Sequence, residues 1–174
     1  KPLIAIIYAE GQIVDGNMVG NGYIYGNTLA ELIRDARLND NIKAVVVRVN
    51  SPGGSALASD IIWREMSLLQ QKKPVVISMG ENAASGGYYI SAPADYIIAD
   101  KLTMTGSIGV FGMIPNISNL LKNHLGITVD YALTSPEAMP ISYLNPMTER
   151  QKEVLLQSVD NIYTTFTRKV AEGR

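Results

Sequence analysis

Cysteine is absent from this 174-residue sequence, and His124 is the one histidine. Without thiols there are no disulfides, thiolate zinc sites or cysteine nucleophiles, and a single histidine excludes a histidine-rich metal site. No run of about 18 apolar residues occurs, so we expect neither a membrane span nor a secretory signal in this segment. Positive charge is not in surplus, since 15 Lys and Arg stand against 16 Asp and Glu, which disfavours nucleic acid as a partner.

The chain does contain enough apolar material for a folded core. Hydrophobic residues make up 47% of the sequence and charged residues 18%, a balance typical of globular domains. The length predicts a single domain over residues 1–174. The ends are abrupt, at Lys1-Pro2 and Gly173-Arg174, and we expect the chain to be a fragment of a longer protein.

Short apolar runs alternate with amphipathic stretches along the chain. Strands are expected at residues 3–8, 44–49, 74–79, 96–99 and 127–133, and helices after Thr28 and at residues 56–71, 87–92, 117–124 and 148–170. Capping boxes are expected at residues 28–31 and 148–151. The alternation predicts an α/β fold with a mainly parallel sheet covered by helices. The uninterrupted apolar strands predict burial on both faces of the sheet.

Two loops that follow expected strands carry the candidate chemistry, because ligands in α/β folds bind beyond the carboxyl ends of strands. The first loop reads Asn-Ser-Pro-Gly-Gly-Ser over residues 50–55. Its adjacent glycines allow close backbone approach and turn N–H groups outward, which suits the binding of a developing oxyanion. A plain strand-to-helix turn is the alternative reading of this loop.

The second loop reads Glu-Asn-Ala-Ala-Ser-Gly-Gly-Tyr over residues 81–88. Ser85 stands among small residues at an expected helix start, where a substrate carbonyl has room and the N–H of Gly86 lies beside the attacked carbon. A serine nucleophile needs this arrangement. The alternative is that Ser85 caps the helix or packs as a small residue.

Together the two loops resemble the Clp-protease/crotonase superfamily, and most closely the signal peptide peptidase A (protease IV) family of serine/lysine peptidases. The matching segments are residues 49–54, 83–91 and 102–110. The resemblance implies a Clp/crotonase-like fold with Ser85 as the acylating nucleophile. It also implies an oxyanion hole made by the N–H of Gly86 and one from Gly53 or Gly54, with Ser107 helping to hold a general-base lysine.

The base that would accept the Ser85 proton is not evident in the chain. His124 falls in the last turn of an expected helix, where an imidazole favourably meets the helix dipole. Lys101 is expected in a solvated turn, and Lys122 and Lys152 on exposed helix faces. Short members of the resembled family carry the lysine in a loop that corresponds to residues 134–142, which contain none.

In the long, duplicated form of the family the lysine comes from the N-terminal half. The resemblance therefore implies that this chain is the serine-bearing C-terminal half, that the lysine-bearing half is its partner, and that it is close to inactive alone. It further implies an endopeptidase that degrades cleaved signal peptides without a metal or organic cofactor. A homo-oligomer anchored in the bacterial inner membrane, with the peptidase outside the cytoplasm, is the implied setting.

Two other functions stay open on the sequence. A crotonase-type acyl-CoA enzyme would use the same oxyanion hole, with Glu81 and Glu137 as acid and base. A non-enzymatic domain would only assemble, through its tyrosines and the apolar residues 110–115. Labelling of Ser85 by a peptidase probe, or retention on a CoA matrix, distinguishes the enzymes.

Overall fold

The computed structural model describes residues 1–20, 22–135 and 138–174, which form two compact units. The core unit comprises Lys1–Gly109 and Ile162–Arg174, and the second unit comprises Val110–Asn161.

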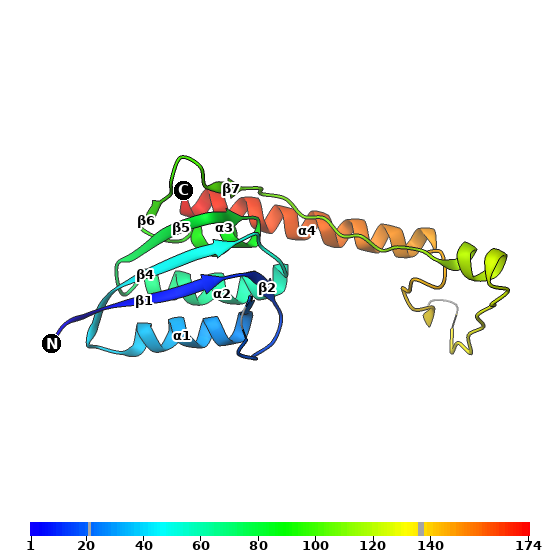
Figure 1. The fold of residues 1–174 in the computed structure, drawn as a ribbon, viewed down its shortest axis with the longest axis horizontal. Coiled ribbons are helices and arrows are strands. Elements are labelled where there is room, and N and C mark those ends of the chain that lie inside the picture. The colour runs from blue at the N-terminus through cyan, green and yellow to red at the C-terminus, as the bar shows by residue number, and fades with distance from the viewer. Residues whose placement is uncertain (21, 136–137) are drawn as a thin grey trace. The chain divides into compact units, whose positions relative to one another are not determined.

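A parallel sheet organises the core unit (Figure 1). Its strand order is β1 (Leu3–Glu10), β4 (Ile42–Ser51), β5 (Val75–Ala84) and β6 (Tyr96–Ile98), and β7 (Met104–Gly106) pairs with the last residues of β5. A separate pair of parallel strands is formed by β2 (Gln12–Val14) and β3 (Tyr23–Tyr25). Helices α1 (Gly26–Leu38), α2 (Ala56–Gln70) and α3 (Gly86–Ser91) connect the strands. The predicted α/β class with a mainly parallel sheet is confirmed.

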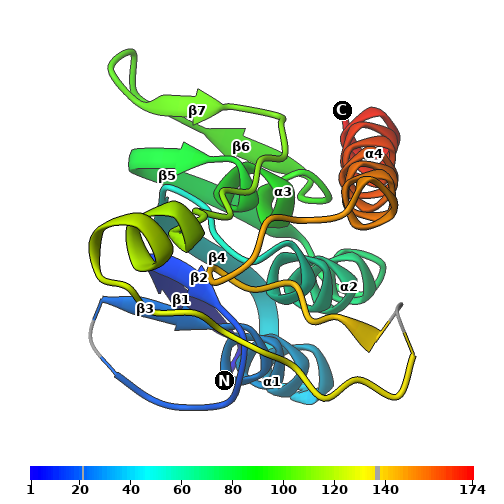
Figure 2. The same cartoon turned by 90° about the vertical axis from the view of Figure 1, so that its right-hand side faces the viewer.

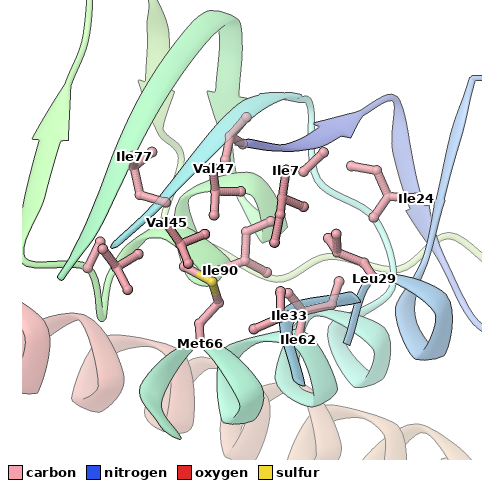
Figure 3. Close-up of a cluster of buried hydrophobic side chains, with 14 of the residues drawn as sticks. Ile7, Ile24, Leu29, Ile33, Val45, Val47, Ile62, Met66, Ile77 and Ile90 are labelled. Carbon is pink, nitrogen blue, oxygen red and sulfur yellow. The ribbon is translucent and has the colours of Figure 1, made fainter. Parts of the chain in front are cut away.

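The hydrophobic core lies between the sheet and the helices on one of its faces (Figures 1 and 2). Val45 and Val47 of β4 point toward Ile33 of α1 and toward Ile62 and Met66 of α2 (Figure 3). All five side chains are at most 1% exposed. The β-branched run of β4 suits a pleated strand, and its inward side chains place the helices against the sheet.

The other face of the sheet is exposed, so the expectation of burial on both faces is wrong. Along β1, Ile7 is 8% exposed, whereas its neighbours Ile6 and Tyr8 are 61% and 65% exposed. Ile98 of β6 is likewise 62% exposed. Apolar composition does not distinguish a strand buried on both faces from one whose second face carries apolar side chains in the open.

Several element boundaries differ from those expected from the sequence. Helix α1 begins at Gly26, so Thr28 lies inside the helix rather than in front of it. The Thr28 Oγ1 donates to the Met18 carbonyl at 3.0 Å and does not cap the helix. The strand expected at residues 127–133 is not formed by these described residues. The short strands β2, β3 and β7 were not predicted; each has only three residues and too little pattern to be recognised.

Helix α4 (Glu149–Gly173) begins in the second unit and ends in the core unit. Its predicted capping box is confirmed: the Gln151 N–H donates to Thr148 Oγ1 at 3.2 Å, and the Thr148 N–H donates to Gln151 Oε1 at 2.9 Å. The second unit also contains the π-helix η1 (Leu120–His124) in place of the α-helix expected at residues 117–124. Across the described part of the chain, no helix combines the length and apolarity needed to cross a bilayer.

Ile62 tests the contribution of the core between α2 and the sheet. Ile62→Ala removes a fully buried side chain, and we expect the free energy of unfolding to fall by about 2–5 kcal/mol. Leu57→Ala is the control on the same helix, because Leu57 is 65% exposed and its loss is expected to change stability by about 0.5 kcal/mol or less. Urea titration measures both, and equal effects would contradict the packing described.

Candidate active site

Ser85 occupies the sharp turn between β5 and α3. Its backbone has φ 51° and ψ −118°, a conformation that residues other than glycine rarely adopt. The Ser85 N–H donates to the Gly106 carbonyl at 2.8 Å, and the Ser85 carbonyl accepts from the Tyr89 N–H at 2.9 Å. The side chain makes no capping hydrogen bond to α3. Ser85 therefore stands at the N-cap position of α3, as the alternative expected, but its hydroxyl does not cap the helix.

The glycine turn after β4 packs directly against the Ser85 turn. Gly53 is buried, with φ 99°, and a Cβ added to it would lie 2.6 Å from the amide nitrogen of Gly86 and 2.8 Å from the Cβ of Ser85. Contacts of a Cβ with other heavy atoms are longer than this, so only glycine permits the approach. The fold thus brings Gly53, Ser85 and Gly86 into contact from two different loops.

The amide groups at this junction differ in their hydrogen bonding. The Gly53 N–H donates to Ser51 Oγ at 3.1 Å, and the Gly53 carbonyl accepts from the Ile13 N–H at 2.9 Å. No described residue accepts a hydrogen bond from the N–H of Gly54 or of Gly86. Because backbone donors are normally paired, these two N–H groups are the candidates for binding a developing oxyanion.

Ser107 follows the end of β7, beside the Ser85 turn. Strand β7 pairs in parallel with residues 82–84 of β5, and its last residue, Gly106, accepts the Ser85 N–H through its carbonyl. Ser107 is exposed and has φ 50°. Among the described residues, Ser85 and Ser107 are the two non-glycine residues with positive φ. Strained backbone of this kind is frequent at functional sites, because the surrounding structure must hold it in place.

The cationic residues considered as bases lie on the surface. His124 is the last residue of η1 and is exposed. Lys101 is exposed in the turn after Asp100, and Lys122 is exposed in η1. Lys152 pairs with Glu149 on the exposed side of α4 at 2.7 Å. The exposed positions predicted for the three lysines are confirmed, as is the place of His124 in the last turn of a helix.

A buried lysine that the sequence did not point to lies at the end of α4. The Nζ of Lys169 forms an ion pair with Asp60 of α2 and lies 3.5 Å from the ring centroid of Trp63. The Tyr89 hydroxyl of α3 donates to the same Asp60 carboxylate at 2.6 Å. We call these four residues the Lys169 cluster. Asp60 and Lys169 are 109 residues apart, so no local pattern predicts their contact.

The charges of the Lys169 cluster shift two pKa values. Burial raises the pKa of Asp60, but hydrogen bonds from Lys169 and Tyr89, and the positive charges of Lys169 and Arg168, outweigh it and lower the pKa below its usual value. Burial, followed by the hydrogen bond to Asp60 and its negative charge, raises the pKa of Tyr89 well above its usual value. The tyrosine hydroxyl therefore stays protonated and acts as the donor.

Glu81, one of the two carboxylates considered for acyl-CoA chemistry, is not part of the Ser85 junction. Glu81 is exposed and lines a cavity of about 460 Å³ together with Arg48 and Asp100. Glu137 lies outside the described residues. Within the described ranges, no group of acidic and histidine side chains is arranged to hold a metal ion.

Residues 67–174 match Peptidase family S49, and this range includes Ser85 and Ser107. The chain is 45% identical to "Protease 4" of Salmonella typhi over 172 residues and 42% identical to "Protease 4" of Haemophilus influenzae over 172 residues. It is 38% identical to "Serine protease SPPA, chloroplastic" of Arabidopsis thaliana over 175 residues. Each comparison covers 98% of this chain. The chain spans about a quarter of the length of these relatives, namely 27%, 28% and 26%.

Gly53 tests the close contact between the two turns. Gly53→Ala adds a Cβ that clashes with Gly86 and strains a positive φ, so we expect the free energy of unfolding to fall by about 2–4 kcal/mol. Gly22→Ala is the matched control, because Gly22 has φ 83° with nothing within 4 Å, and strain alone costs about 1 kcal/mol. Chemical denaturation measures both, and equal losses would show that the two turns are not in contact.

Asp60 gives the Lys169 cluster a predictable pH dependence. Because the pKa of Asp60 is lowered on folding, its stabilising contribution is present above its unfolded pKa of about 4 and is lost as the pH falls through the folded value. We expect Asp60→Asn to lower the free energy of unfolding by about 1–2 kcal/mol at pH 7, since the carboxylate is 47% exposed. The difference from the parent chain should shrink below about pH 4, and a constant difference would contradict the assignment.

Proposed function

Because this chain belongs to peptidase family S49, we propose that it is the nucleophile-bearing segment of a serine endopeptidase that degrades cleaved signal peptides. Ser85 is its nucleophile. The Gly86 and Gly54 amides form its oxyanion hole, and a lysine from another segment of the protein is its general base.

The observation that carries the proposal is the free hydroxyl of Ser85 at a strained turn next to two available amides. A hydroxyl that caps no helix is open to a substrate carbonyl. As Ser85 Oγ attacks that carbonyl carbon, the carbonyl oxygen gains negative charge, which preorganised N–H donors stabilise. Gly54 suits this role better than Gly53, whose own N–H already donates to Ser51 Oγ.

The proton of Ser85 must pass to a base during the attack, and the lysines of the core unit are poorly suited to accept it. Lys73 donates to the carbonyls of Ala36 and Asn39 at 2.7 and 2.6 Å. Lys169 is occupied by its ion pair with Asp60. Lys1, Lys43, Lys72 and Lys101 are exposed to water.

A base lysine must instead be desolvated, so that its amine is neutral when the serine attacks. In the proposed reaction this amine takes the Ser85 proton as the acyl-enzyme forms and gives it to the departing peptide nitrogen. A water molecule then hydrolyses the acyl ester, again with the amine as base. We propose that Ser107, which follows Gly106 at the end of β7, orients this amine through a hydrogen bond.

The setting of the whole protein follows from the family resemblance. Peptides with small or apolar side chains suit a site walled by alanine and glycine residues. We propose a homo-oligomer held at the bacterial inner membrane with the peptidase outside the cytoplasm, where released signal peptides are its substrates. The chain itself spans only part of such a protein, and the partner segment that supplies the lysine completes the site.

A fluorophosphonate probe tests the nucleophile in the full-length protein. Ser85→Ala should abolish labelling and lower peptide-ester hydrolysis by about 10⁴-fold or more, because no acyl-enzyme forms. Ser158→Ala, which removes an exposed hydroxyl from α4, should leave both unchanged. Undiminished labelling of the Ser85→Ala protein would contradict the proposal. Retention on a CoA matrix without labelling would indicate acyl-CoA chemistry instead.

The isolated 174-residue chain tests the origin of the base. We expect its hydrolysis of a peptide ester to be slower than that of the full-length protein by about 10³-fold or more. Adding the preceding segment as a separate polypeptide should restore part of the lost rate, because the lysine then reaches Ser85. Full activity of the chain alone, or no gain from the added segment, would contradict an external base.

A further inference from the structure

Helix α3 has only six residues, yet it carries the amide of Gly86 and fixes the Ser85 turn. So short a helix has little stability of its own, and its position depends on tertiary contacts. The Ser85 carbonyl accepts a hydrogen bond from the backbone N–H of Tyr89 at 2.9 Å. The backbone of Tyr89 thus connects helix α3 to the Ser85 turn.

The side chain of Tyr89 connects this short helix to two others. Tyr89 is 5% exposed, and its ring packs against Phe166 of α4 with the ring centroids 4.7 Å apart. Its hydroxyl donates to Asp60 of α2, which also pairs with Lys169 of α4. One carboxylate therefore receives a donor from α3 and a donor from α4.

Helix α2 also touches the start of α3. A Cβ on Gly86 would lie 2.5 Å from the Oγ of Ser59, the residue that precedes Asp60. Two contacts between α2 and α3 therefore lie within one helical turn of each other: Asp60 with Tyr89, and Ser59 with Gly86. A shift of either helix at the first contact also displaces the Gly86 amide at the second. Packed interiors do not absorb such shifts smoothly.

We propose that Tyr89, held by Asp60 and Lys169, is a positioning residue that aligns Ser85 and the Gly86 amide for attack on the substrate carbonyl. This inference rests on the proposed function of Ser85. The cluster acts through the backbone of α3 and touches neither substrate nor reacting atoms. Its loss is expected to slow acylation while substrate binding is largely kept.

Tyr89→Phe in the full-length protein tests this role. The substitution removes one oxygen atom and keeps the ring against Phe166. We expect kcat for peptide-ester hydrolysis to fall by about 10-fold to 100-fold, the range that small misplacements of reacting groups produce, with KM changed by about twofold or less. The rate of fluorophosphonate labelling should fall in parallel with kcat.

A matched pair of carboxylate variants on α2 separates positioning from general stability. Asp60→Asn removes the negative charge that pairs with Lys169 and weakens the hydrogen bond from Tyr89, whereas Glu65→Gln removes the charge that pairs with Arg37 of α1 at 3.0 Å. Both should lower the unfolding midpoint, but only Asp60→Asn should lower kcat at temperatures where each protein is folded. The Tyr89→Phe, Asp60→Asn double variant should lose less kcat than the two single losses combined, because both substitutions act on the same hydrogen bond.

Lys169→Arg tests rescue by a variant that keeps the positive charge near Asp60. We expect its kcat to fall less than that of Asp60→Asn, because a cation still faces the carboxylate. If Tyr89→Phe and Asp60→Asn change only the unfolding midpoint, as Glu65→Gln does, the positioning role is wrong. Failure of the proposed function is seen separately, as an active Ser85→Ala protein.

Discussion

The contact between the backbone of Gly53 and the first atoms of Ser85 and Gly86 is the constraint on which the site depends. Residue 53 must be glycine, because a Cβ there would lie 2.6 Å from the amide nitrogen of Gly86. Ser85 must adopt a positive φ, which is 51°. Because β4 and β5 pair in parallel, the turns that follow them lie at the same end of the sheet, where the strands finish. Strand pairing thus brings the serine and the glycine turn together, and the missing Cβ of Gly53 permits their close approach.

Contacts from several parts of the core unit hold Ser85 in its strained backbone conformation. Strand β7 accepts the Ser85 N–H through Gly106, and α3 donates to the Ser85 carbonyl through Tyr89. Helix α4, from the far end of the chain, closes on α2 and α3 with its buried lysine. Backbone conformations that cost about 1–3 kcal/mol persist only when such surroundings determine them. The same buried lysine is tied to a carboxylate, which is why proton acceptance is assigned to another segment.

Predictions from the sequence succeeded where the signal was local. The valine run of β4 and the capping box at Thr148 are confirmed, because β-branched residues and reciprocal capping act within a few residues. The same capping pattern at Thr28 is wrong, because its hydroxyl bonds to Met18, ten residues away. Burial of both sheet faces is also wrong, since Ile6 and Tyr8 are exposed and nothing within a strand reports whether a layer covers it.

The sequence by itself determined the order of the longer strands and helices of the core unit, the two glycine-containing loops, the candidate serine and the family to which they belong. These follow from short-range propensities and from motifs of a few adjacent residues. Only the tertiary structure decided that Gly53 touches Gly86, that the Ser85 hydroxyl caps nothing, and that Lys169 meets Asp60 across 109 residues. Such contacts depend on how helices pack on the sheet, and packing joins residues whose sequence separation carries no pattern.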